Sequence, residues 1–246
     1  MNSVDRARAD APTEAVLVVV PVHDEEDLLP ACLASVRGAV EQLGRERPAL
    51  RVATLVVLDG CTDASADIAH GAGVPALVTD RTGVGRARAM GVTAGLALLD
   101  PTTLARAWIA CTDADSVVPR HWLVRQVELA DAGADVVVGT VRPRLGDLSP
   151  DRAAAWQARH VPGRANGHVH GANLGIRAAA YDAAGGFPPV DVHEDVDLVR
   201  ATRQVGARVV ADAGAEVLTS ARLVGRAPGG YARHLREDLV PLDRLA

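Results

Sequence analysis

Lysine is absent from the sequence, so all 26 basic residues are arginines. A chain without lysine cannot form a Schiff base with a carbonyl substrate, and it cannot supply the lysine of a phosphate-binding P-loop. Arginine or a metal ion must therefore neutralise any phosphate group that this protein binds.

Aromatic residues and cysteines are also few, and the chain has no excess of positive charge. Six aromatic residues are too few for a base-stacking platform, and a net charge of −5 argues against a nucleic acid partner. The three cysteines form no C-x-x-C pair, so neither a zinc knuckle nor a redox pair is expected. No apolar run is long enough to cross a bilayer, and the first residues carry no apolar signal-peptide core. We expect a cytoplasmic protein with reduced thiols and no transmembrane segment.

Buried strands are the clearest structural signal in the sequence. Apolar residues make up 48% of the 246 residues, an ordinary value for a globular protein. Several of them form continuous β-branched and aliphatic runs, which are typical of strands buried on both faces of a parallel sheet. These runs lie at residues 16–20, 52–58, 76–78, 108–111 and 136–139.

Helical periodicity fills the intervals between these runs. Apolar residues recur at helical spacing from Leu28 to Leu43, with Asp24 as the expected N-cap. Thr62 or Asp63 is expected to cap a second helix. The alternation predicts a layered α/β fold whose ligand crevice lies beyond the carboxyl ends of the strands. In the less regular second half we expect a helix at 151–159, a loop at 160–173, a strand at 174–177 and a helix at 194–205.

Acidic residues follow several of the predicted strands. Glu25 follows the first strand, Asp59 follows the second, and Asp113 and Asp115 follow the run at 108–111. Since the carboxyl ends of such strands lie at one edge of the sheet, we expect these carboxylates to converge.

Asp113 and Asp115 flank Ala114 in a D-x-D pair. Two carboxylates on one face of an extended segment repel each other unless a cation lies near them. Mg²⁺ or Mn²⁺ would suit the pair, because these ions accept one or two carboxylates and complete their shell with water and phosphate oxygens. The expected ligand is a nucleoside diphosphate.

A glycine-containing turn at 82–91 precedes a further helix. Its N-terminus at Gly83 could face a phosphate, although turn geometry explains the glycines equally well. The turn follows the third strand rather than the first, so it does not match a dinucleotide-binding fingerprint. The arginines expected to neutralise the diphosphate are Arg81, Arg86 and Arg88.

Acidic residues open the helix expected from 194. Glu194 and Asp195 either compensate the helix dipole or include a general base that accepts a proton from an attacking hydroxyl. Histidines 168, 170 and 193 lie near them in the sequence. A neutral imidazole among them could complete a metal shell or contact an acceptor, although surface histidines in loops are commoner.

Seven short blocks stand in order at 19–26, 58–63, 83–88, 113–116, 171–177, 185–187 and 194–198. The order and spacing of these blocks resemble those of the family 2 glycosyltransferases of the GT-A fold. The resemblance covers about residues 15–212. The resemblance implies a mostly parallel central sheet flanked by helices, with a Rossmann-like nucleotide half and an acceptor-binding half. It also implies metal-dependent, inverting transfer of a hexose from a UDP- or GDP-linked sugar to a hydroxyl acceptor, with Mg²⁺ or Mn²⁺.

The resemblance assigns the nucleoside to the ends of the first two strands. Asp59 would read the base edge and Glu25 would lie near the ribose. The sequence departs from the family where Leu58 replaces the first of two acids and Cys61 replaces a serine. The cradle residues would be Pro21, Val22, His23, Glu25 and Asp59.

The resemblance also assigns the reacting end of the site. Asp115 would bind the metal, and Asp113 would contact the ribose or the metal. Asp195 would be the base in a displacement at the anomeric carbon, with adjacent Glu194 as the alternative. The sugar and acceptor pocket would be lined by Gly171, Ala172, Asn173 and His170.

The expected organisation is a flexible tail at 1–14, one domain at 15–220 and a C-terminal tail or helix at 221–246. Within the domain, 15–116 would form the nucleotide-sugar half and 117–220 the acceptor half. Two other functions stay open from the sequence. One is a non-catalytic nucleotide-sugar-binding or regulatory protein, and the other is a sugar-phosphate nucleotidyltransferase, although the glycine-rich loop of the latter is absent after the first strand.

Overall fold

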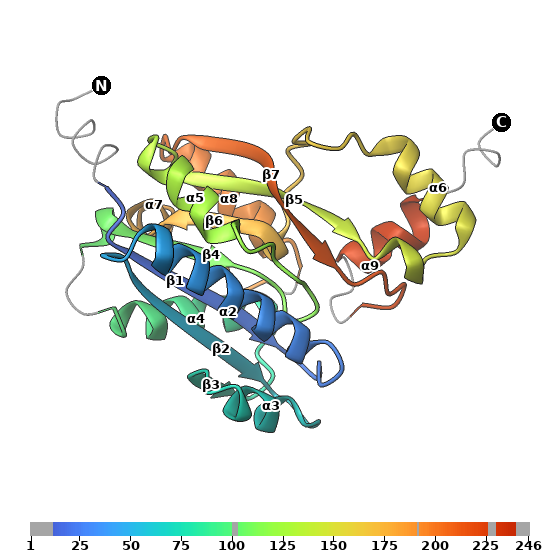
Figure 1. Ribbon diagram of the computed structural model, residues 1–246, viewed down its shortest axis with the longest axis horizontal. Helices are drawn as coiled ribbons and strands as arrows, with labels where there is room; N and C mark the ends of the chain where they lie inside the picture. Colours follow the sequence, from blue (N-terminus) through green and yellow to red (C-terminus); the bar gives the residue numbers. More distant parts are fainter. Residues whose placement is uncertain (1–11, 100–102, 191, 226–229, 240–246) are drawn as a thin grey trace.

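The computed structural model describes residues 12–99, 103–190, 192–225 and 230–239. Residues 1–11 of the predicted N-terminal tail lie outside the described residues, as do 226–229 and 240–246 of the predicted C-terminal tail or helix. The described chain forms one seven-stranded sheet in the order β3-β2-β1-β4-β6-β5-β7, with helices packed on it (Figure 1). The predicted α/β architecture is therefore confirmed.

The first half of the sheet is parallel. β1 (Ala15–Val22) lies between β2 (Arg51–Asp59) and β4 (Ala107–Cys111), and β2 also pairs with β3 (Ala76–Thr79). All eight residues of β1 are buried, as expected of a central parallel strand. Because these strands are parallel, their carboxyl ends meet at one edge of the sheet.

The second half of the sheet is mixed. β6 (Leu174–Arg177) runs antiparallel to β4 and to β5 (Val136–Pro143), while β7 (Val209–Thr219) pairs in parallel with β5. The sequence analysis does not predict β7, because alanine and glycine, which are poor strand formers, interrupt its valines. Insertion of β6 between β4 and β5 joins the two halves of the chain into one sheet.

Helices cover both faces of the sheet, and alternate residues of β1 show the two packing surfaces. Val16 and Val18 face one group of helices, whereas Leu17 and Val19 face the other. None of the helices in the described part of the chain is long and apolar enough to span a membrane. The first group is α2 (Leu29–Glu46), α3 (Ser65–Gly71) and α5 (Trp122–Asp131), and the second is α4 (Val84–Ala97), α7 (Ala178–Ala183) and α8 (Glu194–Gln204).

A smaller apolar cluster lies beyond the carboxyl end of β5, where Figure 1 shows α6 (Pro150–Arg159) next to α9 (Tyr231–Arg233). Trp156 of α6 packs there with buried Ala221 and Leu235. This third cluster ties the end of the described chain to the edge of the sheet at which the parallel strands end. Short helical turns complete the fold at Leu104–Arg106, Leu145–Asp147, Gly171–Asn173 and His234–Asp238.

The predicted capping of the first helix by Asp24 is wrong. The N-cap of α2 is Leu28, and no side chain caps the helix. Asp24 instead has a φ of +50°, and its carboxylate accepts a 2.6 Å hydrogen bond from the backbone N–H of Thr62. The N-cap of α3 is Ala64, so neither Thr62 nor Asp63 holds the predicted cap position. Asp63 still accepts a 2.9 Å hydrogen bond at its Oδ1 from the backbone N–H of Ser65. Asp24 therefore links two neighbouring turns rather than starting a helix.

Candidate active site

A cavity of about 910 Å³ opens at the carboxyl ends of β1, β2 and β4. Its other walls come from the start of α8, the turn at Gly171–Asn173, the loop after β7, and α6 and α9. Most residues predicted for the nucleotide and the metal line this one cavity. They are Pro21, Val22, His23, Glu25, Asp59, Gly83, Asp113, Ala114 and Asp115.

Two predicted site residues do not line the cavity. Arg86 is exposed outside it, because on α4 it lies two positions before Arg88, and residues two apart on a helix do not share a face. Asn173 is buried, and its Oδ1 accepts a hydrogen bond from Trp122 Nε1 at 2.9 Å. Its Nδ2 donates to two backbone carbonyls, each at 2.9 Å. Asn173 is therefore committed to holding the fold together, while Gly171, Ala172 and His170 do line the cavity.

Asp59 anchors the loop that leads from β3 into α4. Its Oδ1 accepts from the Thr79 hydroxyl at 2.8 Å and from the Thr82 N–H and hydroxyl at 2.5 and 2.9 Å, and Oδ2 accepts from the Gly83 N–H at 2.9 Å. Burial acts to raise the pKa of Asp59, but these hydrogen bonds outweigh it and lower the pKa below its ordinary value. Gly83 has a φ of +89°, which only glycine adopts readily. The contact of Asp59 with a nucleobase stays a prediction.

A buried arginine joins α4 to the acids of the site. The guanidinium of Arg88 pairs with Glu194 through Nη1 and with Asp113 through Nη2. Its side chain is 3% exposed. Gly171 packs so closely against it that a Cβ atom there would lie 2.2 Å from the guanidinium. Burial raises the pKa of Glu194 although Arg88 opposes the shift. Glu194 is thus already held by a fixed cation.

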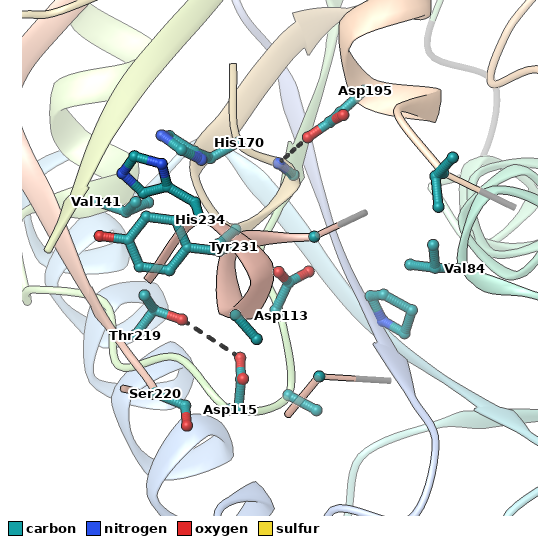
Figure 2. A pocket seen from close by; sticks show the side chains of 18 of the residues that line it. Val84, Asp113, Asp115, Val141, His170, Asp195, Thr219, Ser220, Tyr231 and His234 are labelled. Atoms are coloured by element: carbon teal, nitrogen blue, oxygen red, sulfur yellow. Dashed lines mark hydrogen bonds between the residues drawn. The ribbon is translucent and has the colours of Figure 1, made fainter. Parts of the chain in front are cut away.

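Asp195 lines the cavity from the first turn of α8 (Figure 2). Its Oδ2 accepts from the backbone N–H of Gly171 at 2.7 Å, and its Oδ1 accepts from the N–H of Val196 at 2.8 Å. Within the described ranges Asp195 has no ion-pair partner, in contrast to adjacent Glu194. The backbone therefore orients this carboxylate, and no cation among the described residues forms an ion pair with it.

The D-x-D pair lines the same cavity, and its two carboxylates differ in exposure. The side chain of Asp113 is 36% exposed, whereas that of Asp115 is 13% exposed. Burial and the neighbouring Asp113 raise the pKa of Asp115 to about 6, although Arg222 opposes the shift. A buried carboxylate whose charge is disfavoured, with a second carboxylate two residues away in the same cavity, fits a hard divalent cation such as Mg²⁺ or Mn²⁺.

Aromatic and histidine side chains form another wall of the cavity, which we call the aromatic wall: Trp156, His170, Tyr231 and His234. Figure 2 shows His170, Tyr231 and His234 close together on one side. The Tyr231 ring centroid lies 5.5 Å from that of His170 and 5.8 Å from that of His234, and Trp156 Nε1 donates to the Tyr231 hydroxyl at 3.1 Å. Burial lowers the pKa of His170 to about 4, so its imidazole is neutral near pH 7.

The sequence analysis missed Arg222, Tyr231 and His234 as site residues. All three follow β7, whose alanine-rich sequence gave no strand signal. The rule that identifies Asp59 and Asp113, that side chains just after a strand reach the crevice, also applies to the segment after β7. Recognition of that strand would have indicated Arg222.

The fold is that of the GT-A glycosyltransferases, and sequence comparison agrees. The chain belongs to glycosyl transferase family 2, whose pattern matches residues 17–182. It is 34% identical over 146 residues to an uncharacterized glycosyltransferase of Mycobacterium bovis, covering 59% of this chain and 55% of that protein. It is 32% identical over 176 residues to the undecaprenyl-phosphate 4-deoxy-4-formamido-L-arabinose transferase of Klebsiella pneumoniae, covering 69% and 49%. The matches thus span about half the length of these relatives.

A solved structure supports the fold assignment. The mannosyltransferase of Pyrobaculum calidifontis, in complex with GDP-Man and Mn²⁺, is similar to this chain with a TM-score of 0.57. The two are 21% identical, and the similarity covers 93% of this chain and 61% of that one. At this level of identity the likeness shows a shared fold.

Proposed function

We propose that the protein transfers a hexose from a nucleoside diphosphate sugar to a hydroxyl acceptor, with inversion at the anomeric carbon. Membership of glycosyl transferase family 2 supports sugar transfer. The observation that carries the mechanism is the contrast at the start of α8, where Glu194 is paired with buried Arg88 and Asp195 faces the cavity without a cation among the described residues. An unneutralised, oriented carboxylate is what a general base requires.

The donor would lie along the strand ends. The turn at 21–25 and Asp59 would hold the nucleoside, and Arg81, which lines the cavity, would contact the diphosphate. Asp113 and Asp115 would hold Mg²⁺ or Mn²⁺. The bound ion would stabilise the charge that develops on the leaving diphosphate. The mannosyltransferase structure with GDP-Man and Mn²⁺ supports this donor class.

The acceptor would lie between Asp195 and the aromatic wall. Asp195 would accept the proton of the acceptor hydroxyl while the oxygen attacks the anomeric carbon from the side opposite the leaving diphosphate. The hydrogen bond from Gly171 N–H would keep the carboxylate in place as it becomes protonated. Neutral His170 and the Tyr231 ring provide hydrogen-bonding and apolar surface suited to an uncharged sugar ring.

Replacement of Asp195 tests the proposal. Asp195→Asn keeps the size of the side chain but removes its basicity, so kcat for transfer or for slow donor hydrolysis should fall about 10²–10⁴-fold. Donor affinity, measured by calorimetry, should change little. Asp197→Asn is the matched control, because Asp197 lies on the same helix, does not line the cavity and pairs with surface Arg200.

Glu194→Gln tests the role of Glu194 separately from that of Asp195. It leaves buried Arg88 with one partner fewer, so it should destabilise the fold by about 3–5 kcal/mol. Near-normal kcat in Asp195→Asn would contradict the proposed base. Donor binding by the wild-type protein without any turnover would instead indicate a nucleotide-sugar-binding protein.

A further inference from the structure

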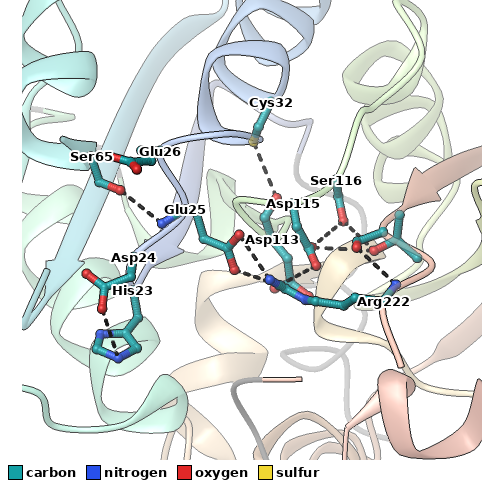
Figure 3. A network of polar contacts seen from close by, with 12 residues as sticks. His23, Asp24, Glu25, Glu26, Cys32, Ser65, Asp113, Asp115, Ser116 and Arg222 are labelled. Carbon is teal, nitrogen blue, oxygen red and sulfur yellow. Dashed lines mark hydrogen bonds and ion pairs between the residues drawn. The ribbon is translucent and has the colours of Figure 1, made fainter. Parts of the chain in front are cut away.

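Arg222 lies between two carboxylates on the nucleotide side of the cavity (Figure 3). Its Nη2 is 2.6 Å from both Glu25 Oε1 and Asp115 Oδ2, and its Nη1 is 3.1 Å from Glu25 Oε2. The Arg222 side chain is 28% exposed, whereas those of Glu25 and Asp115 are 7% and 13% exposed. One partly exposed guanidinium therefore balances two acids that come from the ends of β1 and β4.

The two acids of the D-x-D pair are neutralised in different ways. Asp113 pairs with Arg88, which is buried and also bound to Glu194, so this cation is fixed. Asp115 pairs with Arg222, which extends from the loop after β7. The other contacts of Asp115 are long: its Oδ1 lies 3.3 Å from the Ser116 hydroxyl and 3.5 Å from that of Thr219. Arg222 is therefore the main partner of Asp115 in the described chain.

We infer that Arg222 and a divalent cation compete for the carboxylate of Asp115. The inference rests on the proposed function, which places the ion at Asp113 and Asp115. Two cations on one carboxylate repel each other, and the repulsion is stronger in a half-buried site than in water. Arg222 must consequently release Asp115 when an ion binds there.

The geometry allows this exchange without unfolding the loop. Glu25 holds Arg222 through both carboxylate oxygens, so the arginine can stay on Glu25 after it leaves Asp115. The backbone beside it is anchored, because Ala221 is 3% exposed in the third apolar cluster and the Arg222 N–H donates to Ser220 Oγ at 3.2 Å. A rotation of one side chain is enough. Arg222 thus acts as a positioning residue that holds the Asp115 carboxylate in place and neutralises it between turnovers.

Binding of Mn²⁺ to the protein without donor tests the competition, with the free ion followed by electron paramagnetic resonance. Arg222→Gln should bind Mn²⁺ at least about tenfold more tightly than the wild type, because the competing charge is gone and both acids remain. Arg222→Lys keeps a charge but loses the planar fork that spans both carboxylates, so its affinity should lie between the two. Arg200→Gln is the control, since Arg200 is an exposed arginine paired on α8, and it should leave Mn²⁺ affinity unchanged.

The outcomes separate the inference from the function on which it rests. If Asp115→Asn abolishes Mn²⁺ binding but Arg222→Gln binds Mn²⁺ no more tightly than the wild type, the competition is wrong and the metal site stands. If neither the wild type nor Arg222→Gln binds Mn²⁺, the proposed metal site and the inference both fail. If Arg222→Gln does not fold, Arg222→Lys decides, and an affinity equal to or below that of the wild type overturns the inference. A lower melting temperature with unchanged Mn²⁺ affinity would reduce Arg222 to a structural clamp.

Discussion

Neighbouring acids in this cavity differ in what their oxygen atoms already bind. Glu194 and Asp195 stand side by side in the first turn of α8, so the sequence pattern alone treats them alike. The structure distinguishes them through Arg88, which lies 106 residues from Glu194 and pairs with it, while Asp195 accepts hydrogen bonds from backbone N–H groups. No local pattern contains such a partner. A family resemblance can name the acids, but only packing shows which of them is neutralised.

His170 gives protein stability a dependence on pH. Burial lowers its pKa from 6.5 to about 4, while nearby Asp195 opposes the shift, so between these values the unfolded chain binds the proton more readily. The stabilising contribution of neutral His170 is therefore complete above pH 6.5 and is lost as the pH falls toward 4. We expect His170→Gln to show a smaller decrease in melting temperature between pH 7 and pH 4.5 than the wild type.

Differential scanning calorimetry of the metal-free protein measures this difference. His70→Gln is the matched control, because His70 is an exposed histidine at the end of α3, and its variant should keep the wild-type decrease. An identical decrease in His170→Gln and in the wild type would mean that His170 is protonated as easily in the fold as in the unfolded chain.

At the scale of the element, local pattern predicts the central strands well and their arrangement less well. β1 and β2 are found from continuous valine and leucine runs, because a strand buried on both faces needs apolar residues throughout. β7 is missed, since Ala211, Gly214 and other weak strand formers occupy it and its stability comes from pairing with β5. The antiparallel direction of β6 depends on its pairing with β4 and β5. The sequence of its four residues does not predict that direction.

The loop between β3 and α4 depends on one side chain at the end of β2. Asp59 accepts four hydrogen bonds from Thr79, Thr82 and Gly83, and its side chain offers acceptors only. Asp59→Asn turns one acceptor into a donor that faces other donors, so we expect the free energy of unfolding to fall by about 1–3 kcal/mol. Because the loop also borders the nucleotide side of the cavity, the donor KM should rise more than kcat falls.

Urea denaturation and steady-state kinetics measure the two effects. Asp67→Asn provides the control, because Asp67 is exposed in the first turn of α3 and its replacement should change stability by about 0.5 kcal/mol or less. If Asp59→Asn is as stable as the wild type, other contacts hold the loop. If its donor KM is unchanged, the loop does not contribute to donor binding.

At the scale of the whole molecule, both halves of the chain build the cavity. The strand-end acids come from β1, β2 and β4, whereas Asp195, Arg222 and the aromatic wall come from residues after 150. Ion pairs such as Arg88–Glu194 and Arg222–Glu25 cross between these two parts. The division of the domain near residue 116 stays a prediction, but the shared sheet and the shared cavity mean that ligand binding must stabilise both parts together.

Donor binding should therefore raise the melting temperature of the whole domain. A ligand at 100 times its Kd stabilises a fold by about 2.7 kcal/mol, which corresponds to a shift of about 5–11 °C for a protein of this size. In a thermal-shift series of UDP- and GDP-linked sugars, we expect one nucleotide to act at a much lower concentration than the other. Its effect should shrink when EDTA replaces Mn²⁺, because Asp113 and Asp115 would hold an ion that attracts the diphosphate. Asp115→Asn should show the same reduced shift in melting temperature even with Mn²⁺ present. If no donor shifts the melting temperature of the wild type, the proposed nucleotide-sugar site is refuted.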